Sequence, residues 1–396
     1  MSGYPCNFAT HNADVRGMIN RRTLRIKAMQ VLFAYKQGVA ANYRIAEENI
    51  KEKFSPDLNS MEVQDHALLK VYQKRALELL KGKFKNDGIS PVEENGVVAD
   101  AVDQAIVSYH QLCDKDYRKC RAQLSEQVGK IYSFFIFYFS LIVEFHRVAE
   151  YSEKAVYNNF VNNVLIRGIA LNKPLESAIL ANKLKWGNFA GEVKEWFRSI
   201  VAKDTVFVDY NNVSNPGFEE DQLVLNHLVK KIIFGNEVIS SFMEDLDLHW
   251  AENKPIIKSL IVKTLGNIKE QAPEEFILQE LSYNLEEDEA FFLRLFEEAV
   301  KLDESYKKMI ADKAENWDVE RLAITDRIIL ELAITEMISF PSIPVKVTIN
   351  EYIEVSKKYS TPRSKMFING MLDVIAETLT KSGDIRKSGR GLIDNK

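Results

Sequence analysis

The residues best suited to binding chemistry are three arginines near the N-terminus: Arg21, Arg22 and Arg25. At 100 degrees per residue of helix, their side chains fall within about 100 degrees of one face. No acidic residue lies between Asp14 and Glu47, so positive charge is locally uncompensated. Arginine binds phosphate through a planar guanidinium, and this helix therefore predicts a surface for a nucleic-acid backbone. A basic helix that is merely solvated would show the same pattern about equally often.

A second basic segment spans residues 357 to 367 and mixes cations with aromatic rings. Unpaired bases stack on aromatic side chains while neighbouring cations hold the phosphates, so this combination is typical of sites for single-stranded RNA. The candidate residues are Lys357, Lys358, Tyr359, Arg363, Lys365 and Phe367. From the pattern alone, a core position is favoured for Phe367, because it lies in register with Met371.

Sequence motifs for catalysis are absent. There is no glycine-rich phosphate loop, no Gly-x-Ser-x-Gly turn and no His-Glu-x-x-His. The nearest metal-like group is His110, Cys113 and Cys120, but its spacing does not match a zinc motif and a fourth ligand is lacking. We therefore expect no enzymatic activity, no cofactor and no bound metal.

Composition favours long helices and a reducing compartment. The 396 residues include only 17 Gly and 10 Pro, so tight turns are scarce and an all-α fold is predicted. The net charge of −5 means that attraction for nucleic acid must come from local patches. Three cysteines without disulfide spacing predict a cytoplasmic protein. The apolar stretch Ile131–Phe145 is shorter than the ~20 residues of a membrane span and is expected to be a buried core helix.

Two sets of elements must position the basic segments. Apolar residues at helical spacing predict a helix over 19–37, which Gly38 would end. Further helices are expected over 97–113 and 117–150.

The final third predicts three short helices with tight connections. The first would begin near Asp318 and stop before Pro341. Thr348 and Glu351 have the spacing of a capping box at the start of the next. Thr361 followed by proline would start the last one, whose core-facing stripe is Phe367, Met371, Leu372, Ile375 and Leu379.

The two ends of the chain resemble NusB proteins, especially long forms with an expanded N-terminal half. The resemblance is carried by NRRTLRIKAMQVLFAY near the N-terminus, by IPVKVTINEYIE, and by the Phe-Ile-Asn-Gly-Met-Leu-Asp run from Phe367 to Asp373. It is strong over residues 18–37 and 316–379 and looser over 117–316. It implies an all-α, NusB-like helical bundle of two packed helical subdomains with a large helical expansion.

The same resemblance implies a function by binding rather than by chemistry. NusB proteins recognise single-stranded boxA RNA together with the ribosomal protein NusE and act in the RNA polymerase antitermination complex on ribosomal RNA operons. Matched residue by residue, Arg21, Arg22 and Arg25 correspond to the RNA-contacting arginine-rich start, Phe33 to an RNA-facing tyrosine and Phe367 to an RNA-contacting phenylalanine. Asp326 corresponds to an acidic position near the RNA and partner surface. For Phe367 these matches favour RNA contact over the core.

Two departures and two alternatives accompany this resemblance. Arg363 and Lys365 stand where some relatives carry an acid and a histidine, which predicts RNA binding that depends less on the partner. One alternative is a helical interaction scaffold without RNA binding, and the other is a module related to ribosomal RNA methyltransferases. The second is disfavoured because only residues 380–396 follow the module and no cofactor-binding glycine motif is present.

The expected domain organisation has four parts. Residues 1–17 and 381–396 are predicted to be flexible tails. Residues 18–315 would form an expanded N-terminal helical subdomain, with the insertion at about 43–116. Residues 316–380 would form the C-terminal NusB-like subdomain.

Overall fold

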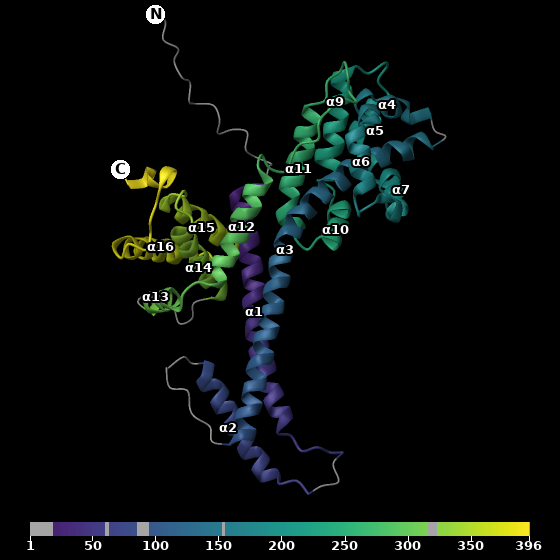
Figure 1. Cartoon of the computed structure of the whole chain (residues 1–396). Coiled ribbons are helices and arrows are strands. Elements are labelled where there is room, and N and C mark those ends of the chain that lie inside the picture. Colours follow the sequence, from purple (N-terminus) through teal and green to yellow (C-terminus); the bar gives the residue numbers. More distant parts are fainter. Residues whose placement is uncertain (1–18, 60–62, 85–94, 153–154, 316–322, 396) are drawn as a thin grey trace, which may run out of the picture. The chain divides into compact units, whose positions relative to one another are not determined.

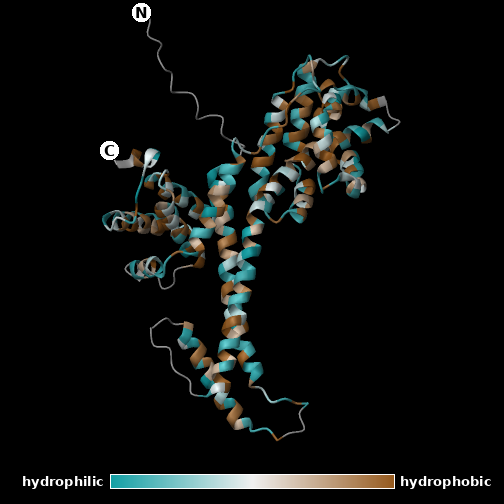
Figure 2. Cartoon of the chain, viewed as in Figure 1, coloured by the Kyte–Doolittle hydropathy of each residue, from teal (hydrophilic) through white to brown (hydrophobic). Residues whose placement is uncertain are grey.

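The computed structural model describes residues 19–59, 63–84, 95–152, 155–315 and 323–395 (Figure 1). Over these residues the chain is helical, with a single isolated β-bridge between Lys269 and Ala272, which confirms the predicted all-α class. Figure 2 shows hydrophobic and hydrophilic residues alternating around the helices, as amphipathic helices require. The predicted tail at 1–17 lies outside the described residues.

The chain forms two compact units built from interleaved segments. One unit contains residues 1–24 and 126–289, and the other contains residues 25–125 and 290–396. Three helices pass from one unit to the other: α1 (Arg21–Lys53), α3 (Gly96–Glu150) and α12 (Leu285–Val300). We call the first the central unit and the second the terminal unit.

The terminal unit contains a bundle of three C-terminal helices. They are α14 (Ile324–Ser339), α15 (Val345–Tyr359) and α16 (Ser364–Lys381), preceded by α13 (Glu304–Glu315). As predicted, α14 ends before Pro341, and the stripe of α16 is buried from Phe367 to Leu379. The predicted start at Asp318 lies outside the described residues. Thr361 Oγ1 accepts a hydrogen bond from the Ser364 backbone N–H at 3.3 Å, consistent with a start signal for α16.

The predicted capping box at Thr348 and Glu351 is wrong. Helix α15 begins earlier, after Pro344, so both residues lie inside it. The Thr348 hydroxyl donates instead to Glu336 of α14 at 2.8 Å, and Glu351 lies 3.5 Å from Arg25. These long-range partners fix where α15 packs, and the local sequence pattern does not predict them.

The described residues of the predicted insertion contribute to a three-helix arm. It consists of the distal part of α1, α2 (His66–Phe84) and the first part of α3. Its own core is made by Ala46, Ile50, Phe54, Ala76, Leu79, Leu80, Val98, Ala101, Val102 and Ala105. The predicted break between 113 and 117 is absent, because α3 is one helix of 55 residues.

Gly38 does not end the first helix, as the sequence predicted, because α1 continues to Lys53. A Cβ atom at Gly38 would lie 2.9 Å from Asp116 Oδ2 of α3. Asp116 in turn accepts a hydrogen bond of 2.8 Å from Asn42. The glycine therefore allows close helix packing rather than a turn.

The central unit contains eight shorter helices besides the second half of α3. They are α4 (Asn158–Asn162), α5 (Val164–Leu171), α6 (Lys173–Ala181), α7 (Ala190–Ser199), α8 (Thr205–Asn211), α9 (Phe218–His227), α10 (Glu237–Leu246) and α11 (Trp250–Gly266). Asn163 and Asn172 break the chain into separate helices, since each side chain accepts a hydrogen bond from the backbone N–H three residues on.

The apolar stretch Ile131–Phe145 lies in the core of the central unit, as predicted. Phe135, Phe137 and Phe139 are at most 1% exposed, and Trp186 stacks on Phe137 at 3.9 Å between ring centroids. Within the described ranges, α3 is the one helix long and apolar enough to cross a membrane, and 72% of its most apolar window is buried inside the protein.

The C-terminal segment was predicted to be a flexible tail, but its described part packs against the turn between α14 and α15. Lys387 Nζ donates to the Phe340 carbonyl at 3.0 Å, and the Ser388 N–H donates to the Pro341 carbonyl at 3.0 Å. A Cβ atom at Gly391 would lie 2.0 Å from the Pro341 carbonyl oxygen, so only glycine permits this approach. A short 3-10 helix, Gly389–Asn395, follows.

Candidate nucleic-acid interface

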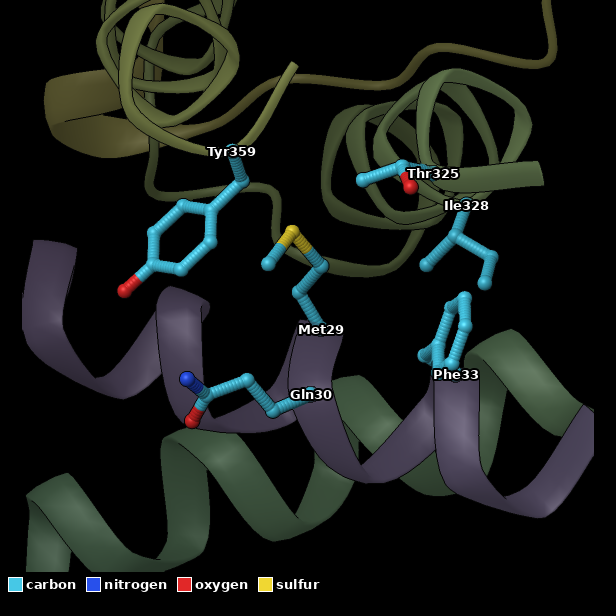
Figure 3. A pocket seen from close by; sticks show the side chains of 6 residues that line it. All are labelled: Met29, Gln30, Phe33, Thr325, Ile328 and Tyr359. Atoms are coloured by element: carbon cyan, nitrogen blue, oxygen red, sulfur yellow. The ribbon is translucent and has the colours of Figure 1, made fainter. Parts of the chain in front are cut away.

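A pocket of about 270 Å³ lies between α1, α14 and the end of α15 in the terminal unit (Figure 3). Its lining residues are Met29, Gln30, Phe33, Thr325, Ile328 and Tyr359. The walls are mainly apolar, and Phe33 presents a partly open ring that is 37% exposed. We call this the junction pocket. Its two aromatic rings, Phe33 and Tyr359, come from residues that lie 326 positions apart in the sequence.

One polar atom of the junction pocket is left without a partner. Gln30 Oε1 is buried and has no hydrogen-bond partner among the described residues. A buried amide oxygen without a donor costs free energy. The junction pocket thus combines aromatic surface with one amide side chain.

Four cations lie close to Tyr359 along the chain, at the end of α15 and the start of α16. Lys358 Nζ lies 5.4 Å from the centroid of the Tyr359 ring, and Lys357 forms an ion pair with Glu354 one turn earlier on α15. Arg363 and Lys365, at the start of α16, are exposed. Four of the predicted residues therefore lie on one short junction with Tyr359.

Asp326 lies inside this junction rather than on the surface. Its side chain is 4% exposed and accepts a hydrogen bond from the Ser360 hydroxyl. Because Ser360 follows Tyr359 directly, this bond fixes the end of α15 against α14. Asp326, which was expected to face a protein partner, is thus buried and orients the neighbouring Tyr359.

Arg25 is buried as well, unlike the open basic face predicted from the sequence. It is 3% exposed, and its Nε and Nη2 atoms each lie 2.7 Å from one carboxylate oxygen of Glu336. Its guanidinium also lies over the rings of Phe291 and Tyr352, at 5.4 and 6.0 Å. The charge is therefore used inside the protein, and Arg25 is not available to phosphate in this structure.

Electrostatics around Arg25 favour the ion pair. Burial opposes the charged guanidinium, but the hydrogen bonds and charge of Glu336 outweigh it and raise the pKa of Arg25. Burial, followed by the charge of Glu336, also raises the pKa of Tyr352 well above its ordinary value. The cluster is an ionised pair beside a neutral phenol, and it ties α1 to α14 and α15.

The other two arginines belong to the central unit. Arg21 forms an ion pair of 2.5 Å with Glu287, and its side chain remains 36% exposed. Arg22 is exposed. These two side chains, unlike Arg25, remain open to solvent.

Phe367 is packed in the terminal bundle at 7% exposure, in register with the buried Met371. The structure therefore places it where the helical pattern alone placed it, and not on the surface that the resemblance implied. Burial on α16 follows from its i, i+4 spacing with Met371 and Ile375.

Four lining residues of the junction pocket were missed from the sequence as site residues. Met29 and Gln30 lie four and three residues before Phe33 and so share its helix face, a relation that the sequence itself shows. Thr325 and Ile328 carried no comparable signal, because only the packing of α14 on α1 brings them to the pocket.

Comparisons with known proteins find similarity to one family in the C-terminal part of the chain. Residues 255–377 match the NusB family. The chain is 44% identical over 103 residues to "Transcription antitermination protein NusB" of Salinibacter ruber, covering 26% of this chain and 64% of that protein. Proteins of the same name from Chloroherpeton thalassium and Koribacter versatilis are 38% identical over 104 residues and 44% identical over 94 residues. These cover 26% and 24% of this chain, and 49% and 64% of the relatives.

The chain thus spans about half to two thirds of the length of these curated relatives. No solved structure matches it. The matched residues include α14, α15 and most of α16, with Tyr359 and Asp326, but neither the arginines of α1 nor the arm. The similarity to the NusB family thus covers residues 255–377 of the chain.

Proposed function

We propose that this protein is a cytoplasmic, non-enzymatic transcription antitermination factor that binds single-stranded boxA-type RNA. It would act with the ribosomal protein NusE in the RNA polymerase antitermination complex that transcribes ribosomal RNA operons. The junction pocket carries the proposal. Two aromatic side chains of the junction pocket, with four cations close to Tyr359 in the sequence, suit an unpaired base and its phosphates.

Each predicted residue has a distinct role in this proposal. Phe33 and Tyr359 stack on bases. Lys357, Lys358, Arg363 and Lys365 hold phosphates, and the partly exposed Arg21 and the exposed Arg22 offer further phosphate contacts within their own unit. Arg25, Asp326 and Phe367 act as positioning residues, because all three are buried.

The test is binding of the full chain to a fluorescent boxA-containing RNA, measured by anisotropy. Removing one stacking ring costs about 1–3 kcal/mol, so Phe33→Ala and Tyr359→Ala should each weaken binding by about 5-fold to 150-fold. Tyr283→Ala is the matched control, because Tyr283 is an aromatic residue that is 89% exposed and lies outside the pocket. Unchanged affinity in a folded Phe33→Ala/Tyr359→Ala double variant would refute the proposed site.

Partner dependence is tested in the same assay by adding NusE. The basic junction at Arg363 and Lys365 supports measurable RNA binding by the isolated protein at low salt. Binding that is absent without NusE would contradict this part of the proposal. RNA binding that is absent even with NusE would favour the interaction-scaffold alternative.

A further inference from the structure

The arm carries a strongly basic helix that the proposed RNA site does not use. Within its 19 residues, α2 has five basic residues and one acid, Glu78. Its net charge is therefore +4, whereas the whole chain has a net charge of −5. The basic residues are Lys70, Lys74, Arg75, Lys81 and Lys83.

Three of these lysines form a row along the solvent face. Lys70, Lys74 and Lys81 are all exposed, and at 100 degrees per residue they fall within an arc of about 40 degrees. The row extends about 16 Å at 1.5 Å per residue. No ion pair with any of the three is found among the described residues. We call Lys70, Lys74 and Lys81 the lysine row.

The opposite face of α2 holds the row in place. Ala76, Leu79 and Leu80 are buried in the core of the arm. Lys83 is excluded from the row, since it forms an ion pair of 2.6 Å with Asp103 of α3. The row is thus presented by a packed helix rather than by a flexible segment, which reduces the entropy lost on binding.

From this geometry we propose that the lysine row binds the phosphate backbone of double-stranded RNA. Lysine is a compact point charge that attracts phosphate without reading bases. The aromatic residues of the helix point into the arm: Tyr72 packs on Phe54 at 6.0 Å, and Phe84 on Tyr43 at 5.2 Å. Single-stranded bases require stacking partners, whereas the bases of a duplex are already stacked and only its backbone needs contacts.

This site adds to the proposed function and does not depend on the junction pocket. Phe33 and the arm core residue Ala46 both lie on α1, 13 residues or about 20 Å apart along its axis. One RNA molecule with a helical segment next to its single-stranded element would therefore have a second contact on the same unit. The duplex contact would be independent of sequence and would increase the residence time of the RNA.

The experiment measures binding of the full chain to a 20-base-pair RNA duplex of mixed sequence without a boxA element, over a range of salt concentrations. The test variant is Lys70→Glu/Lys74→Glu/Lys81→Glu. Its matched control is Lys183→Glu/Lys185→Glu/Lys194→Glu, which makes the same change in net charge at exposed lysines of the central unit. The row variant should bind the duplex at least about tenfold more weakly. The slope of log K against log salt, which is negative, should decrease in magnitude by about 2–3.

Three outcomes decide the proposal. Weaker duplex binding by the row variant but not by the control variant supports the proposal. A smaller loss of duplex binding in Lys70→Gln/Lys74→Gln/Lys81→Gln shows that removing the charges is enough, without reversing them. Equal binding by the row variant and the control overturns it. A row variant that loses binding to single-stranded RNA or to an acidic protein while retaining the duplex overturns it too.

The two RNA proposals fail separately. Phe33→Ala/Tyr359→Ala should lose boxA RNA yet bind the duplex as the wild type does. The row variant should retain boxA affinity for an RNA that lacks a helical segment. Circular dichroism of each variant verifies that the helices are intact.

Discussion

At the residue scale, the main finding is that one arginine of the basic N-terminal cluster is structural. Arg25 differs from Arg22 in being buried, because Glu336 and Tyr352 of distant helices meet it there. Glu336 is itself 0% exposed and also accepts a hydrogen bond of 2.8 Å from Thr348. A carboxylate in this position requires its cation, and the cation requires the carboxylate.

Replacing Arg25 with alanine should strongly destabilise the protein. Removal of one member of a buried ion pair leaves the other charge without compensation and costs about 3–5 kcal/mol. The free energy of unfolding is measured by urea denaturation followed by circular dichroism. The exposed Lys365→Ala serves as control and should change stability by no more than about 0.5 kcal/mol. An Arg25→Ala protein as stable as this control would show that the pair contributes little.

At the element scale, helix ends are set by long-range contacts as much as by local signals. Helix α1 passes through Gly38, where the glycine permits close approach to Asp116. Helix α14 has its C-terminal end covered by the segment after α16, through Lys387 and the Phe340 carbonyl.

Docking of the C-terminal segment should become more stable as pH rises from 8 to 10.5. Burial lowers the pKa of Lys387 from its ordinary value of 10.5 to about 8. Between these values the unfolded chain binds more protons than the folded one, so stability rises with pH and the gain is complete above 10.5. The measurement compares the melting temperature of the wild type with that of Lys387→Met.

The variant removes this titration and leaves the other groups unchanged. Between pH 8 and 10.5 the melting temperature of the wild type should rise relative to that of the variant. Below pH 7 the difference between the two melting temperatures should be constant. A difference that stays flat or shrinks between pH 8 and 10.5 would disprove the role given to Lys387.

At the scale of the whole molecule, the chain has more than one hydrophobic core. The arm buries its own set of apolar residues from α1, α2 and α3. Small separate cores open independently of larger ones, so the arm is expected to have its own stability. This separation would allow the lysine row and the junction pocket to be varied one at a time.

Leu80→Ala should therefore loosen the arm and spare the C-terminal bundle. Leu80 is 0% exposed, and truncation of a buried leucine costs about 2–5 kcal/mol. Hydrogen exchange followed by mass spectrometry should show faster exchange in peptides from residues 46–105 and unchanged exchange in α14 to α16. Leu68→Ala, on the same helix but 43% exposed, is the control. Faster exchange across the whole terminal unit would mean that the arm and the bundle unfold together.

The sequence by itself determined the helical class, the burial of the stripe on α16 and the similarity of the C-terminal part to the NusB family. These features depend on local periodicity and on contiguous motifs, both of which are written along the chain. The same local logic located the basic junction around Tyr359.

Only the tertiary structure decided which members of the basic and aromatic segments face solvent. Arg25 is buried because Glu336, more than 300 positions away in the sequence, packs against it, whereas Phe33 and Tyr359 both line one pocket. The lysine row was identified from the sequence and the tertiary structure together. Its charges are visible in the sequence, but the packing of its helix in the arm is not. Burial and convergence are properties of three-dimensional packing, and helical spacing constrains only which side chains share a face.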